Sequence, residues 1–239
     1  MKKKENSLAS AVIVAAGNSS RMKMDGSKQF LMISGIPVLA RTLLAFDRAA
    51  NIADVTLVTR EQDMMLIWDM VREYQIRKVT SVVPGGSSRQ ESVFIGLCEA
   101  REERVLIHDG ARPLIAAEEI ESVVRALDRC RAAALGVAVK DTIKEVDERG
   151  TVIRTVPRER LVQMQTPQGF YTKEIIEAHK RAQREQIAVT DDCALFEFLH
   201  ISVQVLPGRY QNIKITTPED VALAEALLGQ KRKQRRLMG

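Results

Sequence analysis

Short apolar runs typical of buried strands recur along this chain, and amphipathic stretches separate most of them. The runs are residues 11–16, 55–59, 79–83, 105–108, 134–139 and 202–206. The clearest helical pattern places Ile120, Val123, Val124 and Leu127 on one face, with charged residues around them. Strands that alternate with helices build a mostly parallel sheet covered by helices. We therefore predict an α/β, Rossmann-like fold.

The body of the chain shows no internal repeat, low-complexity segment or linker, so we expect one domain over residues 1–230 and a basic tail over 231–239. The tail contains five of the Lys and Arg residues, which accounts for the whole net charge of +5. A terminal charge run is usually solvated, and aromatic side chains that could stack on bases make up only 4% of the chain. We do not expect nucleic-acid binding.

Cysteine usage and hydropathy bear on the cellular compartment. Cys98, Cys130 and Cys193 are odd in number and widely spaced, which predicts neither a disulfide framework nor a metal site. No apolar run reaches the length of a membrane span, and the first residues lack a signal-peptide pattern. These features predict a cytoplasmic protein that is not associated with a membrane.

The first apolar run leads into a loop suited to phosphate, in which Gly17 is followed by Arg21 and then Lys28. Uncovered backbone N–H groups and a helix N-terminus attract phosphate oxygens, and the two cations add full charges. A P-loop kinase and a simple NAD enzyme are disfavoured, because neither G-x-x-x-x-G-K-[ST] nor G-x-G-x-x-G is present. Gly17 alone fits an ordinary turn, whereas the neighbouring cations favour a phosphate site.

Ligands in such sheets bind beyond the carboxyl ends of the strands, where further motifs follow. Gly85 and Gly86 allow the backbone to approach a ligand, and Ser92 offers a hydroxyl. A plain turn that caps the next helix through Ser87 or Ser88 fits this segment equally well.

Residues 108–113 place an acid and a cation after another strand. Asp109 can hold a hydrated Mg²⁺ ion, and Arg112 can pair with a phosphate. The alternative is an Asp109–Arg112 ion pair that stabilises the turn. We interpret His108 as structural.

Two later segments complete the set of motifs. Residues 139–158 form two alternating stretches about a polar turn, which predicts a hairpin that protrudes and is buried against a partner subunit. Near the end of the chain, Thr216 or Thr217 can cap a final helix that begins at Pro218. Lys214, among apolar neighbours, is either a surface cation or a phosphate ligand.

Taken in order, these motifs resemble one family from about Ala11 to Leu228: the 2-C-methyl-D-erythritol 4-phosphate cytidylyltransferases of the non-mevalonate isoprenoid pathway. The matching residues are Ala15, Ala16, Gly17, Arg21, Met22, Lys28, Gln29, Gly85, Gly86, Arg89, Ser92, residues 108–113, Asp141, Thr142, Arg158, residues 166–168, Thr190, Asp191 and residues 212–214. The resemblance implies a nucleotidyltransferase fold and transfer of a cytidylyl group from CTP to methylerythritol phosphate, with release of pyrophosphate. It also implies a homodimer whose β-arm, at about 140–164, crosses to the other subunit.

The resemblance assigns roles to particular residues. Arg21 and Lys28 would stabilise the transition state and the leaving pyrophosphate, and Arg158 and Lys214 would hold the phosphate of methylerythritol phosphate. The implied nucleotide-binding residues are Ala15, Ala16, Gly17, Gly86, Ser92 and Gly110. The implied substrate pocket adds Asp109, Arg112, Thr142, Thr166 and Thr190, and Asp109 would also belong with Mg²⁺.

The chain departs from the family pattern at Ser19, where many members carry a second glycine, and at Ser27, where proline often precedes the Lys-Gln pair. Ser87 stands where an acidic residue is frequent, which puts one carboxylate contact in doubt. Alternative functions are a ribitol-5-phosphate cytidylyltransferase, a sugar-1-phosphate nucleotidyltransferase and a non-catalytic nucleotide sensor. Gly110 and Ala111 favour methylerythritol phosphate over ribitol phosphate, and the four cations argue against a sensor.

Overall fold

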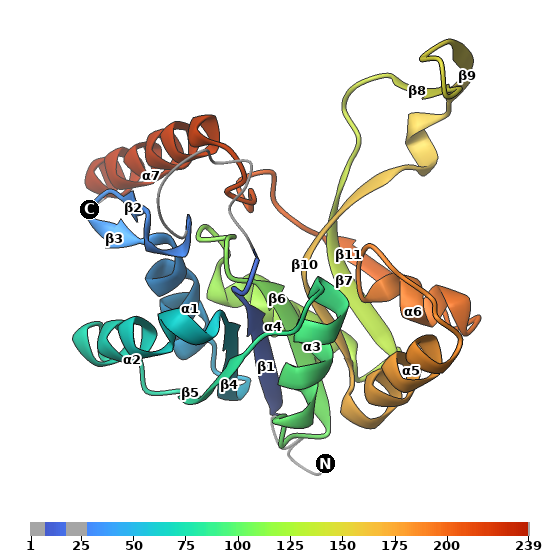
Figure 1. The fold of residues 1–239 in the computed structure, drawn as a ribbon. Coiled ribbons are helices and arrows are strands. Elements are labelled where there is room, and N and C mark those ends of the chain that lie inside the picture. Colours follow the sequence, from blue (N-terminus) through green and yellow to red (C-terminus); the bar gives the residue numbers. More distant parts are fainter. Residues whose placement is uncertain (1–7, 18–27, 239) are drawn as a thin grey trace, which may run out of the picture.

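A central seven-stranded sheet organises the chain in the computed structural model, which describes residues 8–17 and 28–238, with backbone alone at Lys28 and 231–238. The strand order is β11-β7-β10-β6-β1-β4-β5 (Figure 1). The strands are β1 (Ala9–Val14), β4 (Ile52–Thr59), β5 (Val79–Pro84), β6 (Arg104–Asp109), β7 (Ala132–Ala138), β10 (Val162–Tyr171) and β11 (Gln204–Pro207). Only β10 runs antiparallel to its neighbours within this sheet, so the predicted mostly parallel sheet is confirmed.

Helices cover both faces of the sheet. One face packs against α1 (Val38–Arg48), α2 (Met64–Glu73) and α4 (Ala117–Ala126). The other face packs against α3 (Arg89–Cys98), α5 (Thr172–Arg184) and α6 (Cys193–Phe198). The predicted amphipathic face of α4 is confirmed, because Ile120, Val123 and Val124 are fully buried. Each apolar stripe is removed from water against the sheet, which is the main contribution to the stability of such a fold.

Strand β10 was not expected, although it lies in the middle of the sheet. Its residues include Gln163, Gln165, Thr166 and Gln168, so no continuous apolar run marks it. The strand pairs with β6 on one side and β7 on the other, and its register with β7 shifts between Met164 and Gln168. Pairing with two neighbours buries this polar segment from Gln165 to Phe170.

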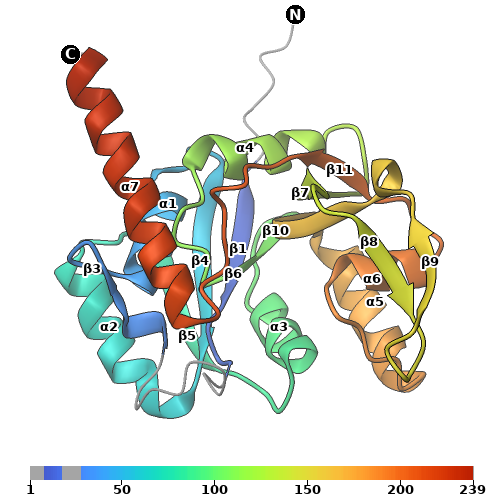
Figure 2. The same ribbon diagram turned by 90° about the horizontal axis from the view of Figure 1, so that it is seen from above.

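A smaller layer lies beside the sheet, where the last helix α7 (Pro218–Met238) packs near the short strands β2 (Met32–Ile33) and β3 (Ile36–Pro37) (Figures 1 and 2). The helical backbone of α7 continues through most of the basic segment 231–239. Thr217 precedes α7, but its hydroxyl donates to Asp220 at 3.3 Å, and the Asp220 carboxylate accepts the Thr217 N–H at 2.8 Å. At the start of α7, the Asp220 carboxylate thus accepts hydrogen bonds from both the N–H and the hydroxyl of Thr217.

The predicted hairpin is confirmed and projects away from the sheet (Figure 1). Its strands are β8 (Ile143–Val146) and β9 (Val152–Val156), joined by a turn in which Gly150 has a φ of +80°. The short helix η4 (Arg158–Arg160) follows before β10. We call residues 140–164 the arm. No helix among the described residues is long and apolar enough to cross a membrane.

Candidate active site

A cavity of about 630 Å³ opens at the carboxyl ends of the parallel strands β1, β4, β5 and β6. Chain segments that leave these strands form most of its wall, because parallel strands end at the same edge of a sheet. The lining residues are Val14, Ala15, Ala16, Gly17, Gln29, Thr59, Arg60, Glu61, Gly85, Gly86, Ser87, Ser88, Arg89, Ser92, Asp109, Gly110, Ala111 and Lys214. All six residues predicted to bind the nucleotide lie in this wall, and their individual roles stay predictions.

The loop between β5 and α3 is held close to the β1 loop. A Cβ atom on Gly85 would lie 2.5 Å from the Ala16 Cβ and 2.9 Å from the Ser92 Oγ, so a side chain at Gly85 has no space. The buried Ser92 hydroxyl accepts the Gly86 N–H at 3.1 Å and donates to the Ser88 carbonyl at 2.8 Å. Ser92 therefore holds the Gly86 backbone next to the start of α3.

The capping interpretation of this loop is confirmed, and the approach of a ligand to Gly85 and Gly86 stays a prediction. Ser88 caps α3, since its Oγ accepts the Glu91 N–H at 3.1 Å. The Glu91 carboxylate in turn accepts the Ser87 N–H at 2.7 Å and the Ser87 hydroxyl at 2.6 Å. Ser87 is thus bonded to a carboxylate in the first turn of α3, although it is not acidic itself.

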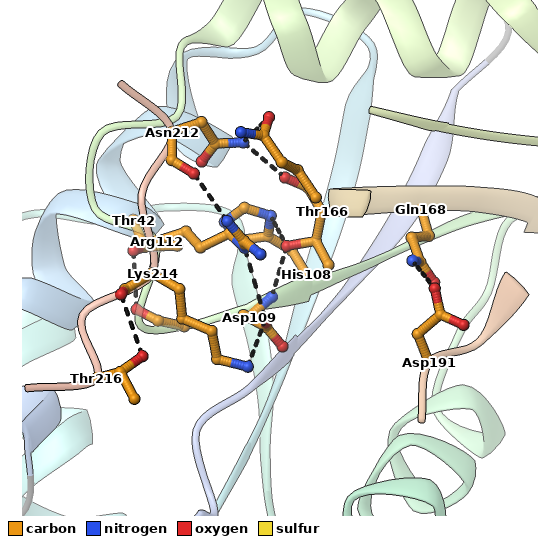
Figure 3. A network of polar contacts seen from close by, with 12 residues as sticks. Thr42, His108, Asp109, Arg112, Thr166, Gln168, Asp191, Asn212, Lys214 and Thr216 are labelled. Carbon is orange, nitrogen blue, oxygen red and sulfur yellow. Dashed lines mark hydrogen bonds and ion pairs between the residues drawn. The ribbon is translucent and has the colours of Figure 1, made fainter. Parts of the chain in front are cut away.

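Asp109 is the centre of a cluster of cations at the end of β6 (Figure 3). Its carboxylate lies 2.8 Å from the Lys214 Nζ, 3.6 Å from the Arg89 Nε and 3.6 Å from the Arg112 Nε. Burial alone would raise the pKa of the Asp109 carboxyl, but the charges of Lys214, Arg89 and Arg112 outweigh it and hold the pKa well below its usual range. The carboxylate is anionic and lies among three positive charges, of which Arg89 is also paired with the Asp192 carboxylate at 2.8 Å.

The geometry shows the ion pairs of Asp109 and Lys214, whereas their binding of a metal or a phosphate stays a prediction. The Asp109–Arg112 pair exists, and Arg112 also donates to the Asn212 carbonyl at 2.8 Å, which ties the β6 loop to the segment before Lys214. Lys214 directs its amine to Asp109 in the cavity and is not an isolated surface cation. An anionic ligand in this cavity would meet an excess of positive charge.

Buried hydrogen bonds among Thr166, His108 and Asn212 hold the backbone of Asp109 (Figure 3). The Thr166 Oγ1 accepts the Asp109 N–H at 3.1 Å and lies 2.9 Å from the His108 Nδ1. Burial lowers the pKa of His108 to about 3, so the ring is neutral at physiological pH and its interpretation as structural stands. Asn212 donates to the Thr166 carbonyl at 2.9 Å. Thr166 is not in the cavity wall and holds Asp109 in place.

The sequence analysis assigned no specific role to Arg89. In the structure, this residue joins the cavity to Asp192 at the start of α6. Its Nη2 donates to the Asp192 carboxylate at 2.8 Å, while its Nε faces Asp109. Asp192 is fully buried, and the Gln168 side-chain oxygen accepts its N–H at 3.1 Å. In the sequence, this contact is indicated only by an arginine shortly after the glycine pair and by the acidic residues Asp191 and Asp192 before α6.

Several predicted residues lie elsewhere. Thr142 and Arg158 are on the arm, where Arg158 donates to the Lys140 carbonyl at 2.8 Å, and Thr190 is exposed in the loop before α6. None of the three lines the cavity within this single chain. Arg21 lies outside the described residues, and Lys28 is described only as the first residue of η2 (Lys28–Phe30).

The donor set for a divalent cation is small. Within residues 8–17 and 28–230, no three His, Cys, Asp or Glu side chains gather as a metal site. Asp109 and Glu61 are the two carboxylate residues in the described wall of the cavity, and Asp109 is the one among the cations. Mg²⁺ commonly uses one or two carboxylates together with substrate phosphates and water, so Asp109 fits that chemistry only with a phosphorylated ligand bound.

Comparisons with known proteins agree with this geometry. The family model described as 2-C-methyl-D-erythritol 4-phosphate cytidylyltransferase matches residues 9–230. The enzyme of that name from Halalkalibacterium halodurans is 45% identical, over 94% of this chain and 99% of its own length. The one from Chlorobium phaeobacteroides is 42% identical, over 96% and 97% respectively. The crystal structure of 4-diphosphocytidyl-2C-methyl-D-erythritol synthase from Anaerococcus prevotii superposes with a TM-score of 0.83 at 34% identity, and the match covers 94% of this chain and 97% of that one.

Proposed function

The chain belongs to the 2-C-methyl-D-erythritol 4-phosphate cytidylyltransferase family, and from that premise we infer the chemistry of its cavity. It is a cytidylyltransferase that transfers the cytidylyl group of CTP to methylerythritol phosphate in isoprenoid biosynthesis and releases pyrophosphate. The phosphate oxygen of methylerythritol phosphate attacks the α-phosphorus of CTP, and the bond from that phosphorus to the bridging oxygen of the pyrophosphate breaks.

The cation cluster around Asp109 is the observation that carries this proposal. Two anionic substrates must meet, and negative charge accumulates on the reacting phosphoryl group and on the leaving pyrophosphate. Fixed positive charges lower that barrier because they are in place before the reaction begins. Lys214 and Arg89 line the cavity, and the Arg112 Nε lies 3.6 Å from the Asp109 carboxylate. Lys28 begins η2 and directly precedes Gln29 of the cavity wall, and Arg21 precedes Lys28 in the sequence. We assign Lys28 and Arg21 to the transition state and Lys214 to the phosphate of methylerythritol phosphate.

Backbone groups at the other end of the cavity suit the nucleotide. Ala15, Ala16 and Gly17 follow β1, and Gly85 and Gly86 follow β5, so two segments with small side chains face each other. Small side chains allow a base or ribose to approach the backbone closely. We place the cytosine and ribose beside Gly86 and Ser92, and the triphosphate towards Gly17.

Mg²⁺ is proposed as the cofactor, with Asp109 as its protein ligand and phosphate oxygens completing the coordination. When bound, the ion neutralises part of the triphosphate charge. The surrounding cations keep the Asp109 carboxylate ionised, but their positive charge opposes a further cation, so phosphate oxygens would have to supply most of the negative charge around the metal.

We also propose a homodimer that shares its sites, because Arg158 and Thr142 lie on the arm and away from their own cavity. The arm exposes apolar side chains, with Val152 55% and Ile153 60% accessible. Exposed apolar surface of this kind is typical of an interface. In the dimer, Arg158 would enter the partner's cavity.

Mixing two inactive variants tests this arrangement. Arg158→Ala and Lys28→Ala subunits, refolded together, create mixed dimers in which one of the two sites has both residues intact. Random mixing makes half of the dimers mixed, so about a quarter of wild-type activity should return. No recovery in dimers shown to be mixed would place Arg158 in its own subunit's site.

The substrate itself is tested by pyrophosphate release from CTP and Mg²⁺, with methylerythritol phosphate and ribitol 5-phosphate in parallel. Release with methylerythritol phosphate alone supports the proposal. Release with ribitol 5-phosphate alone assigns the alternative reaction, and no release with either supports a nucleotide sensor.

A further inference from the structure

Asp63 lies just outside the cavity, where the chain leaves β4 and begins α2. It ends the short helix η3 (Glu61–Asp63) and is only 5% exposed. Three residues near it, Gln29, Thr59 and Arg60, line the cavity, whereas Asp63 itself does not. A buried carboxylate is costly unless donors surround it, so its partners matter.

The Asp63 carboxylate accepts hydrogen bonds from two different segments. Its Oδ2 accepts from the Gln29 Nε2 at 2.7 Å and from the Arg60 Nε at 2.7 Å, and its Oδ1 accepts from the Arg60 Nη2 at 3.1 Å. The only other hydrogen bond described for the Gln29 amide is a long one, 3.4 Å to the Thr59 Oγ1. Asp63 is therefore the main anchor of Gln29, which is itself 4% exposed.

Gln29 directly follows Lys28 in η2, so its anchor also limits where the Lys28 backbone can lie. We propose that Asp63 is a positioning residue for cytidylyl transfer: through Gln29 it fixes the Lys28–Gln29 segment at the edge of the cavity. This inference rests on the proposed function, in which Lys28 stabilises the transition state. Asp63 touches neither substrate and acts through residues that face the cavity.

The expected effect follows from the geometry. Without the carboxylate, Gln29 keeps only its 3.4 Å contact with Thr59, and Arg60 loses both of its bonds to this group. A displacement of about 1 Å in a catalytic group can cost on the order of 10²-fold in rate. We therefore expect Asp63→Ala to lower kcat by roughly 10- to 100-fold while the enzyme stays folded.

Steady-state and single-turnover rates of pyrophosphate release test this in the full-length enzyme. The variants are Asp63→Ala, Asp63→Asn, Lys28→Ala and the double variant of Asp63→Ala with Lys28→Ala. Asp63→Asn keeps a side-chain oxygen that can accept from Gln29, so its loss should be smaller than that of Asp63→Ala. The matched control is Asp69→Asn, which makes the same change at an exposed position of α2. Asp69 pairs only with the exposed Arg72 among the described ion pairs, so the kcat of this variant should be unchanged.

The double variant separates positioning from a purely structural role. If Asp63 acts through Lys28, Asp63→Ala should change the rate of the Lys28→Ala enzyme by less than about twofold, because the group it positions is already absent. An unchanged kcat in Asp63→Ala, or an equal loss with and without Lys28, would overturn the inference. Reduced urea stability with normal kcat would also overturn it.

Failure of the proposed function gives a different pattern. Near-normal kcat in Lys28→Ala contradicts the catalytic role of Lys28, and with it the claim that Asp63 acts through that residue. A large loss in Lys28→Ala with normal kcat in Asp63→Ala contradicts only the inference. If Asp63→Ala does not fold, Asp63→Asn and Gln29→Ala test the same hydrogen bond.

Discussion

Gly85→Ala tests whether the close contact between the β1 and β5 loops shapes the nucleotide end of the cavity. The new Cβ would lie 2.5 Å from the Ala16 Cβ, whereas carbon atoms in contact are normally about 3.5 to 4.0 Å apart. Neither neighbour can rotate away, because the Ala16 methyl group is fixed to its backbone and the Ser92 hydroxyl is bonded to Gly86 and Ser88. The Gly85 N–H is also held by the Thr59 carbonyl at 2.7 Å. The backbone at Ala16 must therefore move by about 1 Å.

A shift of this size in a substrate-contacting loop should lower kcat/KM for CTP on the order of 10²-fold, or about 2.7 kcal/mol of transition-state stabilisation. The free energy of unfolding should fall by about 1 to 3 kcal/mol from overpacking. Initial rates of pyrophosphate release at varied CTP, with urea unfolding in parallel, measure both. Gly229→Ala is the control, since a Cβ there has no neighbour within 4 Å and the site lies on α7. A Gly85→Ala enzyme with kcat/KM for CTP within about threefold of wild type would refute the reasoning.

Three further predictions concern charge and protonation. Lys214→Met should lower kcat/KM for methylerythritol phosphate by roughly 10²- to 10³-fold, because it removes a positive charge next to the reacting phosphate, and initial rates at varied methylerythritol phosphate check this. The pKa of His108 is lowered to about 3 in the folded protein, so the unfolded chain binds the extra proton below about pH 6.5 and stability should fall by about 2 kcal/mol from pH 7 to pH 5. Urea midpoints should show that loss in the wild type and a flatter profile in His108→Asn. Chelation of divalent cations should stop pyrophosphate release, and added Mg²⁺ should restore it; full activity in chelator would contradict the proposed metal.

Much of the fold could be predicted because buried parallel strands leave a local signal. The strands found as β1, β4, β5, β6, β7 and β11 each overlap a run of apolar residues, and α4 shows its helical period. The position of residues 15–17 and of the glycine pair 85–86 in the cavity wall could also be predicted, because ligand sites in such sheets follow the strands. Strand β10 could not, since Gln163, Gln165 and Gln168 give no apolar run and only pairing with β6 and β7 makes the segment a strand.

The sequence by itself determined the α/β architecture, the protruding arm and the residue types of the cavity, because these depend on hydrophobic period and turn chemistry within a few residues. Only the tertiary structure decided which charges meet. Asp109 lies beside Lys214 and Arg89, Arg89 reaches Asp192, and Asp63 reaches Gln29. These pairs join segments far apart in the chain, and no local pattern encodes them, since the order of strands in the sheet brings their loops together.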